Sequence, residues 1–473
     1  MREVLIDPIS VDRLSALLEP ERATRLQDTA TRAVRDLDGR VVWNVNATAQ
    51  GGGVAEMLQS LVAYGRGAGV DTRWLVLHGN PEFFALTKRI HNSLHGSAGA
   101  EFSDADRRLF DDVSAENLAG LAEFVRAGDI VVLHDPQTAG LVAGVRRIGA
   151  YAVWRCHIGK DASDEVTDAA WQFLRRYVEP ADAFVFTRAA YVPRWVDRGR
   201  VRIIPPSLDP FTAKNEYLPV GDVLSTLRIA GIVEAPDAGG SVAFTRRDGS
   251  RGTTRPHEGL VHGGPLPADA RVVLQVSRWD DLKDMQGVLT GFARRVDDLP
   301  ADAHLMLVGP DAAGVSDDPE GARVLDECLG LWRALPPAAA ARVHLCVLPM
   351  DDGDENAHIV DALQRYASIV VQKSLVEGFG LTVTEAMWKA KPVVASNVGG
   401  IADQIVDGVS GVLLDDPADL DAFADALVGL LHDDARTARL ATNAHERARA
   451  QFLGDRHLAQ SVDLFRKLLA NAR

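Results

Sequence analysis

The sequence contains little cysteine: its 473 residues include only Cys156, Cys328 and Cys346, which lie far apart along the chain. An odd number at this spacing fits neither a disulfide framework nor a four-ligand metal site. We therefore expect reduced thiols with structural roles, and we predict no metal-binding residues.

Long apolar runs are absent as well. No segment approaches the roughly 18 apolar residues that a membrane-spanning helix requires. The amino terminus, MREVLIDPISVDRL, mixes acidic with apolar residues and lacks the cationic region and continuous apolar stretch of a secretory signal. We therefore expect a cytoplasmic protein that has no membrane partner.

Positive charge is also scarce. Lysine and arginine number 51 against 66 aspartates and glutamates, which gives a net charge of -15. Because nucleic acids are bound mainly through cations that displace counterions, this balance disfavours a nucleic-acid partner. An anionic ligand would have to be held by a local group of cations and backbone amides.

The chain is long enough for two domains, since a single hydrophobic core rarely grows beyond ~300 residues. Short apolar runs alternate with helical patterns, which is typical of a parallel sheet covered by helices. We therefore predict an α/β protein with two doubly wound, Rossmann-like domains. The runs that predict strands are VVWNVN, RWLVLHG, DIVVLHD, AYAVWRC and DAFVFT, followed by RVVLQVS, AHLMLVG, RVHLCVLP, SIVVQ and KPVVAS.

The composition changes between the two series of predicted strands. The segment PPSLDPFTAKN at 205–215 is a candidate linker, and the following residues to about 266 are rich in Gly, Asp, Arg and Thr. Such composition is typical of loops, so we predict an insertion or loop excursion over 220–266. From about residue 435 the chain is rich in Ala, Arg and Leu, which predicts helices with a solvated charged face.

Three consecutive glycines at 51–53 follow the run VVWNVN and precede a helical pattern of apolar residues. They do not form the dinucleotide fingerprint G-x-G-x-x-G, because Glu56 stands at its last glycine position. A tight turn would require only one or two glycines. Three favour close approach of a ligand to the amides of a helix start. The predicted apolar face of this helix is Val54, Met57, Leu58, Leu61 and Val62.

Two cations follow the run RVVLQVS: Arg278 and Lys283, in VSRWDDLKD. Ligands of open α/β sheets gather beyond the carboxyl ends of the strands, where two cations could clamp a diphosphate. Spacing alone leaves an alternative open, in which these cations are solvated and only balance the charge of the neighbouring aspartates Asp280, Asp281 and Asp284.

The stretch LVEGFGLTVTEAMWKAKPVVASNVGG spans 375–400 and carries two glutamates eight residues apart. Glu377 precedes a glycine-bearing loop, and we expect Glu385 in the first turn of a helix that ends near Lys389. Thr382 and Glu385 also have the spacing of a capping box. A capping box would leave Glu377 and the loop unexplained, whereas amides at a helix start suit a phosphate.

Two histidine-bearing segments, LHDPQ at 133–137 and WRCHIGKDAS at 154–163, lie at predicted strand ends in the first half. A single histidine is more often a structural residue than a ligand-binding one. Because both segments lie on the same predicted sheet as the glycine loop, a structural and a functional role for His157 stay equally open.

Together the glycine loop, S-R-x4-K and E-G-F-G-L-T-x-x-E resemble the retaining family 4 glycosyltransferases of the GT-B fold. Longer segments, among them NVNATAQGGGVAEML, HDPQTAG, WRCHI and FTRRDGS, resemble the trehalose glycosyltransferring synthases, to which the retaining trehalose phosphorylases are similar. The resemblance implies an acceptor-side domain at 1–206, a donor domain at 207–455, and a cleft between them. It also implies that the last helix, 456–473, packs back on the first domain.

By this resemblance, Arg278 and Lys283 bind the donor diphosphate, Glu385 the ribose and Glu377 a hydroxyl of the donor sugar. His157 contacts the reacting sugar, so the implied catalytic residues are Glu377, His157, Arg278 and Lys283. The remaining implied contacts are Gly52, Gly53, Gly378, Phe379, Gly380, Leu381 and Thr382 for the donor, and Asp135, Lys88, Asn92 and His157 for the acceptor glucose.

The implied reaction transfers glucose from a nucleoside diphosphate glucose to glucose, with retention, and gives α,α-trehalose. Phosphorolysis of trehalose, another acceptor, and a nucleotide-sugar binding protein without turnover are the alternatives. One departure concerns the acceptor: the synthases usually read H-I-D where this chain has H-I-G-K-D, so that the acid is displaced to Asp161. The resemblance implies no tightly bound cofactor. It leaves the base, the direction of the reaction and an assisting Mg²⁺ open, and a symmetric homodimer is the ordinary expectation.

Overall fold

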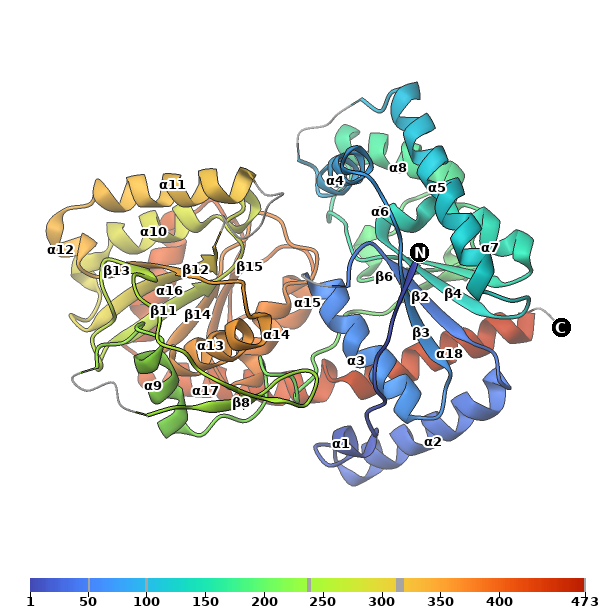
Figure 1. Cartoon of the computed structure of the whole chain (residues 1–473). Coiled ribbons are helices and arrows are strands. Elements are labelled where there is room, and N and C mark those ends of the chain that lie inside the picture. The colour runs from blue at the N-terminus through green and yellow to red at the C-terminus, as the bar shows by residue number, and fades with distance from the viewer. Residues whose placement is uncertain (50–51, 98–100, 236–239, 312–318, 472–473) are drawn as a thin grey trace. The chain divides into compact units, whose positions relative to one another are not determined.

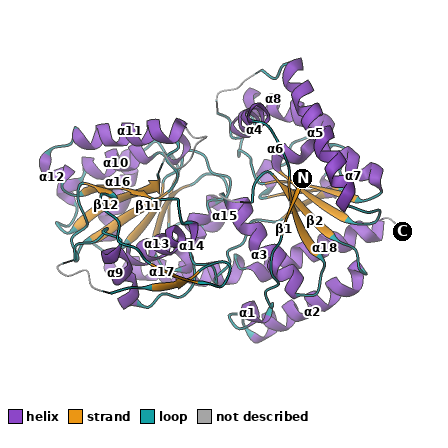
Figure 2. Cartoon of the chain, viewed as in Figure 1, coloured by secondary structure: helices purple, strands orange, loops and turns teal. Residues whose placement is uncertain are grey.

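The computed structural model describes residues 1–49, 52–97, 101–235, 240–311 and 319–471 (Figure 1). The chain divides into two compact units, one formed by Met1–Leu208 with Leu453–Arg473 and the other by Asp209–Phe452. Each unit contains a seven-stranded sheet with helices on its faces (Figure 2). No helix among the described residues is long and apolar enough to cross a membrane.

The first unit is built on a sheet in the order β1-β3-β2-β4-β5-β6-β7. All neighbouring strands are parallel except β1, which is antiparallel to β3. The strands are β1 (Arg2–Val4), β2 (Val42–Asn46), β3 (Thr72–Val76), β4 (Ile130–His134), β5 (Tyr151–Cys156), β6 (Ala183–Phe186) and β7 (Val201–Ile203).

Helices cover both faces of this first sheet. On one face α2 and the carboxyl-terminal α18 pack on Val42, Val132 and Val153, and α3 packs beside them on Trp74. On the other face Trp43, Leu133 and their neighbours meet α4, α5, α7 and α8. Because successive side chains of a strand point to opposite faces, the two cores alternate along each strand. The helices are α1 (Asp12–Ser15), α2 (Pro20–Leu37), α3 (Gly53–Gly67), α4 (Pro81–Leu94), α5 (Asp104–Phe124), α6 (Asp135–Thr138), α7 (Val142–Ile148), α8 (Glu165–Val178) and α18 (Gly454–Asn471).

The second unit has a sheet in the order β10-β13-β12-β11-β14-β15-β16, parallel except for β10. Its strands are β10 (Val261–His262), β11 (Arg271–Val276), β12 (Ala303–Pro310), β13 (Val343–Leu348), β14 (Ile369–Gln372), β15 (Val393–Ser396) and β16 (Val412–Leu414). Its helices are α9 (Val220–Ile229), α10 (Met285–Arg294), α11 (Pro319–Arg333), α12 (Pro337–Ala340), α13 (Gly353–Tyr366), α14 (Leu381–Trp388), α15 (Ile401–Gln404), α16 (Leu420–Leu431) and α17 (Asp434–Gln451).

Residues 220–266 contain regular elements: helix α9, the hairpin of β8 (Ala243–Thr245) and β9 (Arg251–Thr253), and strand β10. Helix α9 packs on α13, and ion pairs tie the hairpin region to the start of α13. Arg246 Nη1 donates to Asp352 at 2.6 Å, and Arg255 Nε donates to Glu355 at 2.6 Å. The segment is therefore a folded part of the second unit.

The predicted fold class is confirmed, because each apolar run named above forms a strand at the centre of one of two sheets. The strands that sequence analysis did not predict have two or three residues each: the edge strands β1, β7, β10 and β16, and the separate hairpin of β8 and β9. All three cysteines are buried and free. Burial raises the pKa of each thiol, so these thiols stay protonated and unreactive.

Candidate active site

The two cations that follow β11 have different surroundings. Arg278 is 61% exposed, and its guanidinium donates to Asp280 at 3.0 Å. Lys283 ends a short 3₁₀ turn, Asp281–Lys283, and its ammonium is only 17% exposed. Lys283 Nζ lies 2.6 Å from Glu377 Oε2. The interpretation as a solvated cation beside aspartates therefore fits Arg278, whereas Lys283 belongs to a partly buried ion pair.

Glu377 is held at a defined place by a chain of hydrogen bonds. Ser374 Oγ donates to Glu377 Oε2 at 3.2 Å, and Gln372 Nε2 donates to Ser374 Oγ at 2.9 Å. Gln372 Oε1 in turn accepts from Thr382 Oγ1 at 2.8 Å, so the end of β14 is tied to the first turn of α14. The Glu377 side chain is 12% exposed, so it is partly shielded from water.

The loop between Glu377 and α14 is held in a glycine conformation. Gly380 has φ 80°, which favours glycine, and α14 begins at the next residue. The side chain of Gln404 donates to the carbonyl oxygens of Phe379 and Gly380, and Gly400 N donates to Gly378 O at 3.2 Å. The first N–H groups of a helix have no partner within it and, with the helix dipole, favour an anion. This helix start is suited to a phosphate.

Glu385 is the fifth residue of α14 and lies just past its first turn, so the prediction of a first-turn position was wrong by about one residue. The capping-box interpretation is also excluded, because the N-cap is Gly380 and the Thr382 hydroxyl donates to Gln372. The Glu385 side chain is 3% exposed, and its Oε1 lies 3.0 Å from Lys214 Nζ. Its Oε2 is buried and has no hydrogen-bond partner among the described residues. Such an oxygen is able to accept a hydrogen bond from a hydroxyl group of a ligand.

In the first unit, Gly51 lies outside the described residues, and Gly52 and Gly53 form the start of α3. Gly52 has φ 81° and ψ 155°, and a Cβ built on it would meet nothing within 4 Å. The positive φ of Gly52, and not a lack of space for a side chain, therefore favours glycine at this position. The predicted helix is confirmed, with Met57, Leu58 and Val62 buried.

The last predicted pair lies where β4 and β5 end. Asp135 follows β4 with φ 62°, and its Oδ1 accepts from the backbone N of His157 at 2.8 Å. Burial raises the pKa of Asp135 to about 7, although this hydrogen bond and nearby Arg155 act in the opposite direction. Burial, reinforced by Arg155, lowers the pKa of His157 well below its usual value. The structure thus joins Asp135 to a neutral His157.

Sequence analysis missed His134 as the partner of His157, and Asn44 as the partner of His134. His134 Nδ1 lies 3.1 Å from His157 Nε2, and His134 Nε2 lies 3.2 Å from Asn44 Oδ1. A signal was available in the sequence: Asn44 and His134 are polar residues within the apolar runs that predict two strands of the first sheet.

A second missed contact joins β5 to α18. Buried Arg155 Nη1 lies 2.8 Å from His457 Nε2, and His457 Nδ1 lies 3.1 Å from Ser207 Oγ. Arg155 Nη2 also donates to Ile204 O at 3.1 Å. Burial lowers the pKa of Arg155 to about 9 and that of His457 well below its usual value. The carboxyl-terminal helix therefore supports the strand that precedes His157.

Lys88 and Asn92, the weaker acceptor candidates, lie one turn apart on α4, where Lys88 is exposed and Asn92 is half-buried. Helix α4 packs on α6, which begins at Asp135, so the fold brings their helix beside that carboxylate.

The altered loop after His157 has a packing reason. A Cβ at Gly159 would lie 2.2 Å from the Tyr191 ring, so the ring excludes an aspartate at that position. The displaced acid Asp161 instead accepts from Arg188 Nη1 at 2.7 Å. Its side chain is therefore engaged in an ion pair within the first unit.

Among the described residues, no group of three or more His, Cys, Asp or Glu side chains could hold a metal ion. The second unit instead offers a helix start, an ammonium and two acidic side chains at the carboxyl edge of its sheet. In open α/β sheets that edge is where ligands bind.

Solved structures with the same fold include sucrose-phosphate synthase from Thermosynechococcus elongatus, at 20% identity and a TM-score of 0.64, over 91% of this chain and 100% of that one. Another is Anabaena Alr3699/HepE in complex with UDP-glucose, at 17% identity and a TM-score of 0.59, over 91% of this chain and 98% of that one. Together with residues 353–447, which match the family "Glycosyl transferases group 1", they define the class: a glycosyltransferase of the GT-B fold.

Residues 44–193 match the family "Trehalose synthase, N-terminal domain". Trehalose synthase from Pyrococcus horikoshii is 32% identical over 96% of this chain and 95% of its own, and that from Rubrobacter xylanophilus is 34% identical over 96% of each. The chain therefore belongs to the trehalose synthase family. A trehalose phosphorylase from Pleurotus pulmonarius is 28% identical over 82% of this chain and 52% of its own, so the predicted relationship to both groups is confirmed.

Proposed function

We propose that this enzyme transfers glucose from a nucleoside diphosphate glucose to the anomeric hydroxyl of glucose and so forms α,α-trehalose. Two full-length relatives carry the name trehalose synthase, and a protein of the same fold was solved with UDP-glucose. Within the chain, the observation that carries the proposal is the Lys283–Glu377 ion pair beside the start of α14.

The second unit would bind the donor. Lys283, with Arg278, would meet the diphosphate, whose other oxygens would accept from the amides of Gly380, Leu381 and Thr382. Glu377 would accept from a hydroxyl of the donor sugar, and the unpartnered Oε2 of Glu385 would accept from a ribose hydroxyl. Gly378 and Phe379 would keep the loop flat enough for this approach. A buried carboxylate oxygen without a donor is costly, which supports a ligand hydroxyl at Glu385.

The first unit would bind the acceptor. Gly52 and Gly53 would let the start of α3 approach the phosphates, and His157 would contact the reacting sugar. Asp135, Lys88 and Asn92 would bind the acceptor glucose.

The chemistry requires stabilisation of the leaving group. As the bond between the sugar C1 and the phosphate oxygen breaks, negative charge grows on the phosphate and C1 becomes oxocarbenium-like. Cations and oriented amides placed at that phosphate lower the barrier. The acceptor oxygen would then bond to C1 on the same face, while its proton passes to the leaving phosphate. Trapping a covalent glycosyl adduct on a carboxylate would disprove this mechanism.

Phosphorolysis of trehalose is the second candidate, because a phosphorylase is also a relative and inorganic phosphate suits the same helix start. The protein is incubated with trehalose plus either phosphate or a nucleoside diphosphate, and the glucosyl products are identified by NMR. Nucleoside diphosphate glucose as the product supports the synthase proposal, and glucose 1-phosphate overturns it. If neither product forms, the enzyme uses another acceptor. A screen of donors and acceptors then identifies that acceptor and the preferred base of the donor.

Metal dependence and assembly belong to the same set of tests. We propose that no metal ion is required, since the side chains and amides named above meet the diphosphate. Activity should then survive EDTA, and a loss that Mg²⁺ restores would contradict this. A homodimer is the proposed assembly, and light scattering on the purified chain tests it.

A further inference from the structure

A chain of three side chains crosses the first sheet on one face. Asn44 lies on β2, His134 ends β4, and His157 follows β5. The two imidazole nitrogens that face each other are 3.1 Å apart, and the ring planes are within 9° of parallel. This is the geometry of a hydrogen bond in the plane of both rings, so one ring must donate and the other accept.

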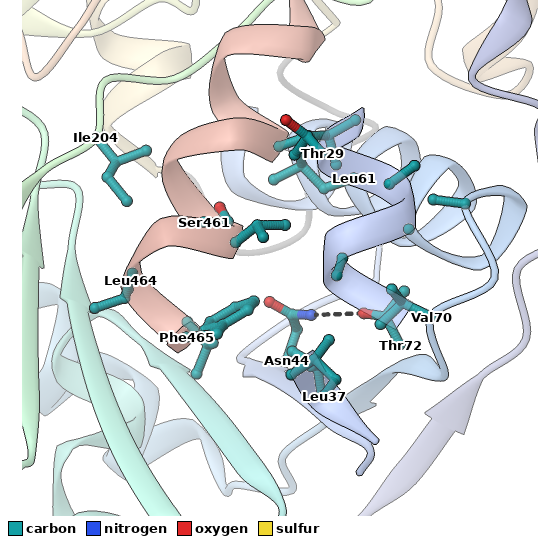
Figure 3. A pocket seen from close by; sticks show the side chains of 18 of the residues that line it. Thr29, Leu37, Asn44, Leu61, Val70, Thr72, Ile204, Ser461, Leu464 and Phe465 are labelled. Atoms are coloured by element: carbon teal, nitrogen blue, oxygen red, sulfur yellow. Dashed lines mark hydrogen bonds between the residues drawn. The ribbon is translucent and has the colours of Figure 1, made fainter. Parts of the chain in front are cut away.

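Asn44 determines which ring donates. Its Nδ2 lies 3.5 Å from Thr72 Oγ1, a contact drawn in Figure 3, and its Oδ1 lies on the side of His134. An amide oxygen only accepts, so His134 Nε2 at 3.2 Å must carry a proton. In a neutral ring the other nitrogen, Nδ1, then has none and accepts from His157 Nε2. His157 in turn keeps a bare Nδ1.

Both rings are held neutral by their surroundings. His134 is buried and His157 is partly buried, and burial lowers the pKa of each well below its usual value. The charged group that faces them from β5 is Arg155, which lowers both pKa values further, and His457 from α18 lies beyond it. A protonated His134 would donate from both nitrogens and break the chain, and a protonated His157 would lose its bare Nδ1.

We propose that Asn44 and His134 are positioning residues that hold His157 in its Nε2–H tautomer, so that its Nδ1 accepts a hydrogen bond from a sugar hydroxyl. The contact with the sugar rests on the proposed function, whereas the tautomer does not. A hydroxyl that must donate to Nδ1 is held in one orientation. The relay thus selects a substrate hydroxyl at one position over an analogue that lacks it.

The tautomer is measured directly by ¹⁵N NMR of the histidine rings in the free full-length protein, with His157 assigned by the loss of its signals in His157→Gln. We expect a protonated Nε2 and a bare Nδ1 for His157 and His134. His457 supplies an internal contrast, since its Nε2 faces the donor-only Arg155 and its Nδ1 must carry the proton. A protonated Nδ1 on His157 in the wild-type protein overturns the proposal.

Asn44→Leu removes the acceptor from His134. Unpaired buried N–H groups are rarer than unpaired acceptors, so His134 should shift to its Nδ1–H form and donate to His157. The His157 proton then moves to Nδ1. Unchanged His157 signals in a folded Asn44→Leu protein overturn the proposal. The matched control is Asn46→Leu on the same face of β2, whose amide bonds Trp74 and Thr48 instead; it should leave the His157 tautomer as it is.

Kinetics separate this proposal from the proposed function. If a tenth of the Asn44→Leu molecules keep the competent tautomer, the apparent KM of the sugar that contacts His157 rises about tenfold, with kcat little changed. Both substrates are varied to find which sugar this is. If the tautomers are as stated but the wild-type protein forms no trehalose, the proposed function fails and the relay stands. If trehalose forms and His157 carries its proton on Nδ1, the relay fails alone.

Discussion

The Lys283–Glu377 pair permits a sharp test of the donor site. Lys283→Met removes the ammonium and keeps most of the side-chain stem. The two charged groups are 17% and 12% exposed and 2.6 Å apart, so this pair is better shielded from water than an ordinary surface ion pair. After the substitution Glu377 still accepts from Ser374, which keeps its carboxylate in place. The change therefore removes charge at the proposed diphosphate and little else.

The expected loss follows from the role of the charge in the transition state. Removing one group that stabilises developing negative charge costs about 3 kcal/mol, or on the order of a hundredfold in rate. Because phosphate charge grows only as the bond to C1 breaks, most of the loss should appear in kcat, with a smaller rise in the donor KM. A merely structural pair would instead lower stability and leave the kinetics of the folded fraction unchanged.

The assay follows trehalose formation at varied donor concentration and compares thermal unfolding of the two proteins. Arg271→Met is the matched control, since Arg271 pairs with Asp302 at 2.7 Å at the opposite end of β11, away from the proposed donor site. This control should keep the wild-type kcat and lose at most ~1 kcal/mol of stability, as expected for an exposed ion pair. Near wild-type kcat for folded Lys283→Met, or an equal loss in the control, would refute the reasoning.

Three further predictions concern other parts of the proposed site. Gly53→Val should lower kcat/KM at least tenfold (about 1.4 kcal/mol), because the side chain blocks the approach of a ligand to the α3 amides, while the unfolding midpoint stays near that of the wild type. An equal loss of activity and stability would indicate that the glycines serve only as a turn. Glu385→Gln should raise the donor KM about 10- to 100-fold, since hydrogen bonds to charged groups contribute about 1.5–3 kcal/mol; steady-state kinetics with an unchanged KM would contradict this. Asp135 has a pKa of about 7, raised from 3.8, so its folded form binds more protons and stability falls as pH rises between these values. Asp135→Asn cannot lose a proton at this position, so its thermal unfolding midpoint should rise relative to that of the wild type between pH 4 and pH 7. A fall in this difference would contradict the prediction.

Local patterns were sufficient wherever the deciding contacts are close in sequence. The run VVWNVN forms β2 because its apolar residues suit a strand with both faces covered, and the glycines end it where α3 begins. The segment around Glu377 carries its own loop, helix start and second glutamate within about ten residues. Periodicity placed that helix but not its first residue, so Glu385 lies about one residue beyond the first turn where it was predicted.

The sequence by itself determined the two Rossmann-like sheets, the family, and the motifs that follow β11 and β14, since each depends on short-range periodicity or contiguous residues. Only the tertiary structure decided which side chains meet. Sheet order places β2 beside β4 and β4 beside β5, which brings Asn44, His134 and His157 together. Likewise, α18 returns to the first unit and sets His457 against Arg155, 302 residues away in sequence. Hydrogen bonds depend on distance in space, and no pattern along the chain encodes a pairing between residues so far apart.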